Sequence, residues 1–189
     1  MLSIAQRPLS YVDALDRRAL DSIRSVVIHA TELPHMETAR EYGERIHYEE
    51  SGTGNSGHFY IDRDGSIEQW VPLDRVAHHV RDHNAGSVGI ELVNRGRWPD
   101  WYDSRHQEWE ETFPDAQIQA LIELISMLES KLPALAEIAG HDQLDHDWIE
   151  ASDNPEILVR RKTDPGPVFP WTQVLSATSL QLHHASEGK

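Results

Sequence analysis

The stretch SVVIHA, residues 25–30, decides the fold. It is short, apolar and rich in β-branched residues, which is typical of a buried strand. The strand carries His29 near its end, and a strand terminus is a rigid place from which an imidazole can be aimed into a cleft. The stretch therefore predicts both a central strand and a candidate functional histidine.

Strands and helices alternate outward from this strand, and no internal repeat interrupts them. The longest helix is predicted where Ile118, Leu121, Ile125 and Leu128 form one apolar stripe. The expected elements are a helix over 37–50, a hairpin over 58–72 around the Asp64-Gly65 turn, a strand over 87–93, a helix over 114–132, a strand over 137–140 and a helix over 167–175. This order predicts a mixed α/β fold, with a central mixed β-sheet flanked by helices.

Length and composition favour one folded domain. The chain has 189 residues, of which 39% are hydrophobic and 26% charged, with six tryptophans. We expect an N-terminal extension over 1–22, the main domain over 23–176 and a polar, mobile tail over 177–189.

The charge balance bears on partners. Lys and Arg total 17 against 32 Asp and Glu, which gives a formal charge of −15. Such a surface repels phosphate backbones and anionic lipid, so we expect neither a nucleic-acid nor a membrane partner. No feature of the sequence predicts a protein partner.

The first twenty residues lack a basic segment followed by a continuous apolar run, and no stretch approaches eighteen apolar residues. We therefore expect no signal peptide and no membrane span, and a cytoplasmic location. Export by a leaderless route, or removal of a leader from the chain, are the alternatives.

Twelve histidines in a chain without cysteine favour a metal bound through nitrogen and oxygen. His29 ends one strand, and His141 follows a short strand and a glycine. Asp164 lies in the stiff stretch KTDPGP, residues 162–167, and would supply the third ligand. Two imidazoles and one carboxylate leave zinc an open position, which is typical of a catalytic site.

Other metal sets compete with this one. His79 and His83 are four residues apart, and His141 and His146 are also close in sequence, but the motif H-E-x-x-H is absent. The stretch DRDG, residues 62–65, resembles the start of a calcium loop, although it offers no closing glutamate at the right distance and a hairpin turn is favoured.

Glu91 interrupts the apolar strand VGIELV. A carboxylate there is costly unless it is paired, linked to a metal or facing a cavity. It is either part of a solvated strand face or a general base in an active site.

Five blocks occur in an order that is similar to one family: VVIHAT, GHFYIDRDGSIEQWVP, NAGSVGIELVN, GHDQL and RKTDPGPVFPW. Over about residues 23–175 the chain resembles the zinc-dependent N-acetylmuramoyl-L-alanine amidases, whose fold group includes amidase-type phage lysozymes and peptidoglycan recognition proteins. The resemblance implies Zn²⁺ as the cofactor, with His29, His141 and Asp164 as ligands. It also implies Glu91 as the catalytic carboxylate and Lys162 as the cation beside the reacting carbonyl.

The same resemblance implies a substrate, the amide between the lactyl group of N-acetylmuramic acid and L-alanine of the stem peptide. We expect action on (anhydro)muropeptides in cell-wall recycling. The alternatives are an amidase that attacks intact peptidoglycan and a peptidoglycan-binding module without catalysis.

Two features depart from the family pattern. Gly57 stands where related branches often have a tyrosine, which favours proton transfer by Glu91. The stretch 94–113 is dense in tryptophan. Trp98, Trp101 and Trp109 either line a glycan groove or pack against the helix that follows, and we favour packing.

Overall fold

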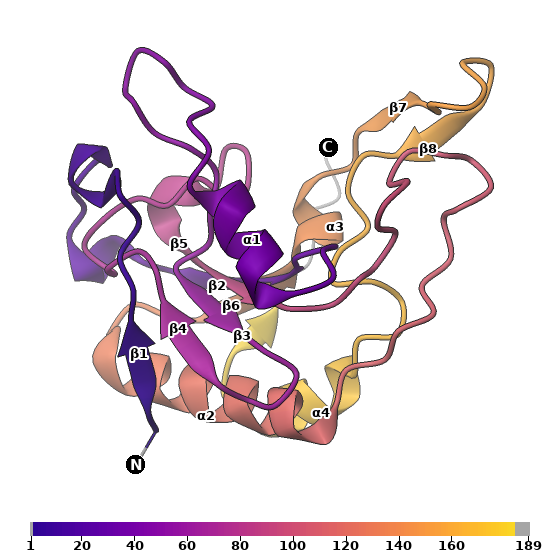
Figure 1. Ribbon diagram of the computed structural model, residues 1–189. Helices are drawn as coiled ribbons and strands as arrows, with labels where there is room; N and C mark the ends of the chain where they lie inside the picture. Colours follow the sequence, from indigo (N-terminus) through magenta and orange to yellow (C-terminus); the bar gives the residue numbers. More distant parts are fainter. Residues whose placement is uncertain (1, 184–189) are drawn as a thin grey trace, which may run out of the picture.

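The structure is a computed structural model, and it describes residues 2–183. Its centre is a seven-stranded sheet in the order β1-β4-β3-β5-β2-β6-β9 (Figure 1). The strands of this sheet are β1 (Ile4–Gln6), β2 (Ser25–Ala30), β3 (Phe59–Ile61), β4 (Ile67–Gln69), β5 (Ser87–Leu92), β6 (Glu137–Gly140) and β9 (Gln181–Leu182). β3 and β4 form the predicted antiparallel hairpin, whereas β3, β5, β2, β6 and β9 run parallel, so the sheet is mixed.

Helices cover both faces of the sheet. They are α1 (Met36–Gly43), α2 (Asp115–Lys131), α3 (His141–Leu144) and α4 (Trp171–Ser176), with short 3-10 turns at Val12–Ala14, Leu20–Ser22 and Asn84–Gly86. In Figure 1, α2 lies below the sheet and α1 above it. The strands β7 (Trp148–Glu150) and β8 (Leu158–Arg160) form a separate antiparallel hairpin beside the sheet.

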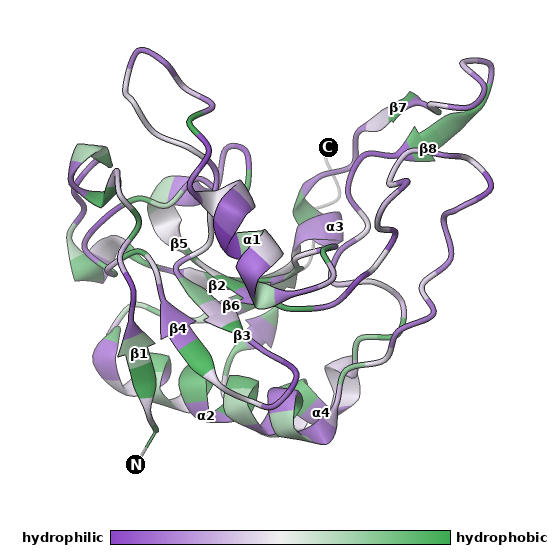
Figure 2. Ribbon diagram, viewed as in Figure 1, coloured by the Kyte–Doolittle hydropathy of each residue, from purple (hydrophilic) through white to green (hydrophobic). Residues whose placement is uncertain are grey.

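The main core lies between the sheet and α2. Val26 and Ile28 of β2 and Ile90 of β5 point into it, where they meet the apolar stripe of α2. In Figure 2, the ribbon of α2 alternates between green and purple, as a helix with one buried side should, and α1 is mostly purple. Because side chains alternate along a strand, His29 and Glu91 point to the opposite face of the sheet.

Two predicted helices have different bounds. The helix predicted over 37–50 ends at Gly43, where the chain passes close to Trp70: a Cβ on Gly43 would lie 3.0 Å from the indole. The helix predicted over 167–175 begins only at Trp171, after Pro170. Proline has no N–H to donate and tends to stand at or before the first turn of a helix.

Both ends of the described chain contribute to the sheet. Residues 4–6, which we expected in an extension, pair with β4, and residues 181–182 of the expected mobile tail pair with β6. The tail prediction is therefore wrong for these two residues, because their backbone groups take part in the ladder of the sheet. Residues 177–180 and 183 of the predicted tail are also described: Thr178 and Ser179 donate to the Glu129 carboxylate, and the His183 amide donates to the Ile138 carbonyl. Residues 184–189 of the predicted tail lie outside the described residues. Within the described part, no helix is both long and apolar enough to cross a membrane.

Candidate metal centre

A row of polar side chains crosses the sheet on the α1 side. In the register of the parallel strands, His29 of β2 pairs with Glu91 of β5, and Glu91 pairs with Tyr60 of β3. Residues in register on adjacent strands lie side by side, about 4.8 Å apart. The register of the strands therefore brings His29 and Glu91 together on one face of the sheet, although they are 62 positions apart in the sequence.

Two further side chains reach this row from beyond β2. His141 follows β6 directly, at the first position of α3, and Asp164 lies in the loop before α4. The two segments are joined because the Asp142 amide donates to the Asp164 carbonyl at 2.9 Å.

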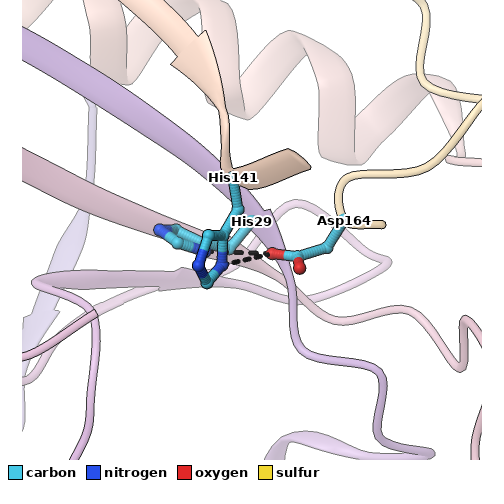
Figure 3. Close-up of side chains that lie close together, drawn as sticks. All are labelled: His29, His141 and Asp164. Atoms are coloured by element: carbon cyan, nitrogen blue, oxygen red, sulfur yellow. Dashed lines mark hydrogen bonds and ion pairs between the residues drawn. The ribbon is translucent and has the colours of Figure 1, made fainter. Parts of the chain in front are cut away.

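His29, His141 and Asp164 converge as the sequence predicted (Figure 3). All three are buried, with exposed fractions of 2%, 3% and 2%. Asp164 Oδ2 lies 3.0 Å from His29 Nδ1 and 3.2 Å from His141 Nδ1. Ligand atoms 2.0–2.1 Å from a tetrahedral zinc ion are about 3.3 Å apart, so these separations fit a metal ion.

An unsatisfied carboxylate oxygen also favours a cation here. Within the described residues, Asp164 Oδ1 is buried without a hydrogen-bond partner. Burial opposes the charge on Asp164, but His141 and His29 outweigh it and hold the pKa of this carboxyl well below its usual range. The cluster thus presents an ionised carboxylate and two imidazoles at one point, a donor set that suits zinc.

The three side chains line a polar cavity of about 520 Å³, which Glu91 and Lys162 also line. Burial raises the pKa of Glu91, with the charge of Asp164 adding to the effect and His29 and Lys162 opposing it. The structure therefore brings all five predicted site residues into one cavity.

The loop that carries Asp164 is held by packing. Gly166 has φ +90°, and a Cβ there would lie 2.4 Å from Trp109 Cδ2. Trp109 is buried against this glycine, and its indole N–H donates to Thr163 Oγ1 at 3.2 Å. The prolines and the tryptophan together fix the backbone on both sides of Asp164.

The competing metal sets are not assembled. Among the described residues, the one group of three or more potential ligands is the cluster of His29, His141 and Asp164. His83 and His146 are exposed and lie outside it. Asp62 and Asp64 belong to the β3–β4 turn. The backbone carbonyl of Asp62 accepts the Gly65 amide, and the carboxylate of Asp64 accepts the Ser66 amide.

Gly57 makes room for Glu91. A Cβ on Gly57 would lie 2.8 Å from Glu91 Cγ, which is closer than real Cβ contacts allow. A larger residue at this position would therefore compete with the carboxylate for the same space. Tyr60 accepts the Gly57 amide through its hydroxyl oxygen at 3.1 Å and fixes the backbone here.

The tryptophans of 94–113 pack, as we favoured, although not only against the following helix. Trp98, Trp101 and Trp109 are absent from the residues that line the cavity. Trp101 donates to the Glu32 carbonyl at 3.0 Å and meets Tyr42 edge to face. These side chains tie the stretch to the elements around the site.

Sequence reasoning missed a buried ion pair beside the site. Arg97 donates to both carboxylate oxygens of Glu32, at 2.8 and 3.0 Å, and to the carbonyls of Arg160 and Arg161. Glu32 adopts a left-handed conformation with φ +50°. No local pattern pairs these two residues, which are 65 positions apart.

A cleft at the carboxyl ends of parallel strands, with a buried His-His-Asp cluster beside a carboxyl and a lysine, is typical of one class of protein, the metal-dependent hydrolases. The family model for N-acetylmuramoyl-L-alanine amidase matches residues 19–167. The chain belongs to this family.

Individual relatives agree with this assignment. The chain is 32% identical to the 1,6-anhydro-N-acetylmuramyl-L-alanine amidase AmpD of Salmonella typhimurium, over 68% of this chain and 59% of the relative. It is 36% identical to the N-acetylmuramoyl-L-alanine amidase AmiD of Escherichia coli, over 57% of this chain and 36% of that protein. The matched region thus spans at most about three fifths of these curated relatives.

Solved structures share the fold. The amidase LysC from Clostridium intestinale superposes with a TM-score of 0.68 at 22% identity, covering 96% of this chain and all of that one. AmiD from E. coli, in complex with anhydro-N-acetylmuramic acid-L-Ala-D-gamma-Glu-L-Lys, gives a TM-score of 0.61 at 26% identity, covering 86% of this chain and 60% of that one.

Proposed function

We propose that the protein is a zinc-dependent amidase that hydrolyses the bond between the lactyl group of N-acetylmuramic acid and L-alanine of the stem peptide. The observation that carries the proposal is the buried cluster of His29, His141 and Asp164 beside Glu91 and Lys162 in one cavity. Membership in the amidase family supports the choice of bond.

The cluster would hold the metal through Nδ1 of each imidazole and a carboxylate oxygen of Asp164. When bound, a zinc ion polarises the attacking water and the scissile carbonyl. His29 and His141 hold their Nδ1 atoms 3.0 and 3.2 Å from Asp164 Oδ2, so the protein presents these ligands already arranged.

Glu91 acts as the general base and then as the general acid. It accepts the proton of the attacking water and passes it to the leaving nitrogen of L-alanine, which leaves as an amine. The side chain is partly buried and its pKa is raised, which suits a carboxyl that must both take up and release a proton.

Lys162 stabilises the negative charge that develops on the carbonyl oxygen. An ammonium held in the cavity interacts more strongly with the charged transition state than with the neutral amide, and this difference accelerates the reaction. The loop that carries Lys162 also carries Asp164, so the metal ligand and the cation are positioned by one segment.

We further propose that the substrates are free anhydro-muropeptides, as in cell-wall recycling. The support is the similarity to several proteins named 1,6-anhydro-N-acetylmuramyl-L-alanine amidase. The charge of −15 agrees with this choice, because an acidic surface does not favour adhesion to an anionic wall. A cytoplasmic location remains a prediction.

The test compares substrates. The zinc-loaded protein is incubated with anhydro-muropeptides, with the same peptides on the reducing sugar, and with intact sacculi, and released stem peptide is followed by mass spectrometry. We expect release from the soluble fragments and much less from sacculi. Release from sacculi alone would favour a wall-lytic amidase, and binding without release from any substrate would favour a non-catalytic module.

A further inference from the structure

His79 contacts the metal cluster without belonging to it. It lies in the segment between β4 and β5, and its Nδ1 is 3.0 Å from Nε2 of His29, on the side of the imidazole away from Asp164. The two rings meet edge to face, with centroids 5.1 Å apart. None of the roles derived above uses this histidine.

The hydrogen bonds beyond His79 determine its tautomer. The Ser87 hydroxyl donates to the His83 carbonyl at 2.8 Å, so its single proton is already used. Ser87 Oγ therefore accepts from His79 Nε2, which lies 3.1 Å away. An imidazole that carries its one ring proton on Nε2 offers a lone pair at Nδ1.

The same chain then determines the tautomer of His29. Since His79 Nδ1 is an acceptor, His29 Nε2 must donate to it. This hydrogen bond places the ring proton of His29 on Nε2 and leaves Nδ1 as the atom with the lone pair, directed at Asp164 Oδ2, 3.0 Å away. A lone pair facing a carboxylate oxygen at this distance needs a cation between them.

The surroundings hold His79 in this position. A Cβ on Gly89 of β5 would lie 2.6 Å from Cγ of His79, so the glycine leaves the space that the ring fills. Asn84 Oδ1 accepts the backbone amides of His79 and Val80 at 2.9 and 2.8 Å. Both the ring and its backbone are therefore fixed.

We propose that His79 is a positioning residue, which fixes the tautomer and the ring orientation of His29 through the chain His29–His79–Ser87 and so prepares Nδ1 to bind the metal. The inference rests on the proposed function for the identity of the metal. Partners of this kind, on the far nitrogen of a ligating histidine, are worth about 10–100-fold in metal affinity.

The first experiment measures zinc affinity by competition with a chromophoric chelator, for the wild type, H79A, H79N and H83A. We expect H79A to raise the Kd by about 10–100-fold. In H79N the side-chain carbonyl can accept near the position of Nδ1, so affinity should be largely recovered. H83A removes an exposed imidazole of the same segment and should leave the Kd unchanged. An unchanged Kd in H79A, or equal losses in H79A and H79N, would overturn the proposal.

The second experiment needs neither a variant nor zinc. Long-range ¹H–¹⁵N spectra of the chelator-treated wild type at pH 8 report which nitrogen of each imidazole carries the proton. We expect the Nε2–H form for both His29 and His79, and the Nδ1–H form of His29 would overturn the proposal. If the wild type bound no zinc, the proposed function would fail, while these spectra would still decide the tautomer.

Discussion

At the scale of single residues, the site depends on a few side chains held at short distances. Asp164 faces both histidines, and Glu91 shares the cavity with Lys162. Two substitutions test the reacting groups separately from the metal site. One removes a reacting group, the other displaces one, and both leave the three ligands in place.

The first is K162A. We expect kcat to fall by about 10²–10³-fold, as when a single donor to an oxyanion is lost. Zinc content, measured by elemental analysis, should equal that of the wild type, because Lys162 is not among the ligands. Full turnover with normal zinc would show that Lys162 has no part in stabilising the charge.

The second is G57A, which places a methyl group where it would lie 2.8 Å from Glu91 Cγ. The carboxylate must then move, and a displacement of about 1 Å can cost up to ~10²-fold in rate. G86A is the matched control, because its nearest neighbour would be 3.9 Å away. If kcat/KM of G57A equalled that of G86A, the space beside Glu91 would not matter.

At the scale of elements, the register of the sheet and one buried ion pair hold the site together. The ladder aligns His29 with Glu91, and Arg97 ties the end of β2 to the backbone that leads to Lys162. Glu32 and Arg97 are 6% and 1% exposed, so the removal of either charge leaves the other buried and unpaired.

For R97M we therefore expect a loss of about 3–5 kcal/mol in the free energy of unfolding, measured by urea denaturation. R105M is the control, because the Arg105–Asp103 pair lies on the surface of the same stretch and should contribute little. Equal stabilities of the two variants would contradict the role given to Arg97.

The sequence predicts the central strand and the long helix well, and the edge strands of the sheet poorly. SVVIHA is a strand over its full length because every residue after Ser25 is buried, and the stripe of α2 is a long local signal. The edge strands β1 and β9 have only three and two residues, so neither shows a pattern. They exist because β4 and β6 offer them unpaired backbone groups.

The sequence likewise predicts part of the candidate site and misses another part. His29, His141, Asp164, Glu91 and Lys162 stand in motifs that resemble a known family, and the structure places them in one cavity. His79 could not be separated from the neighbouring histidines, because its partner is 50 positions away and no period in the sequence relates the two. Contacts of this kind depend on tertiary packing alone.

At the scale of the whole molecule, metal binding and folding should be linked. The cluster draws on β2, the start of α3 and the loop before α4, so a bound ion connects segments from distant parts of the chain. An ion that binds the folded state and not the unfolded one stabilises the fold.

We expect a chelator to lower the Tm. Zinc at a hundredfold excess over its Kd contributes about 2.7 kcal/mol, which is roughly 5–10 °C for a chain of this size. Differential scanning fluorimetry with and without chelator measures the shift, and D164A, which should bind no zinc, is the control. A chelator-induced shift in D164A as large as that in the wild type would show that Asp164 is not a ligand.

The most direct test of the central claim follows the oxygen atom of the attacking water. The zinc-loaded protein is given an anhydro-muropeptide in H₂¹⁸O, and the products are analysed by mass spectrometry, with E91Q as the inactive control. We predict free stem peptide that begins with unlabelled L-alanine, and one ¹⁸O in the lactyl carboxylate of the sugar. Cleavage at another bond, label in the peptide, or equal turnover by E91Q would contradict the account.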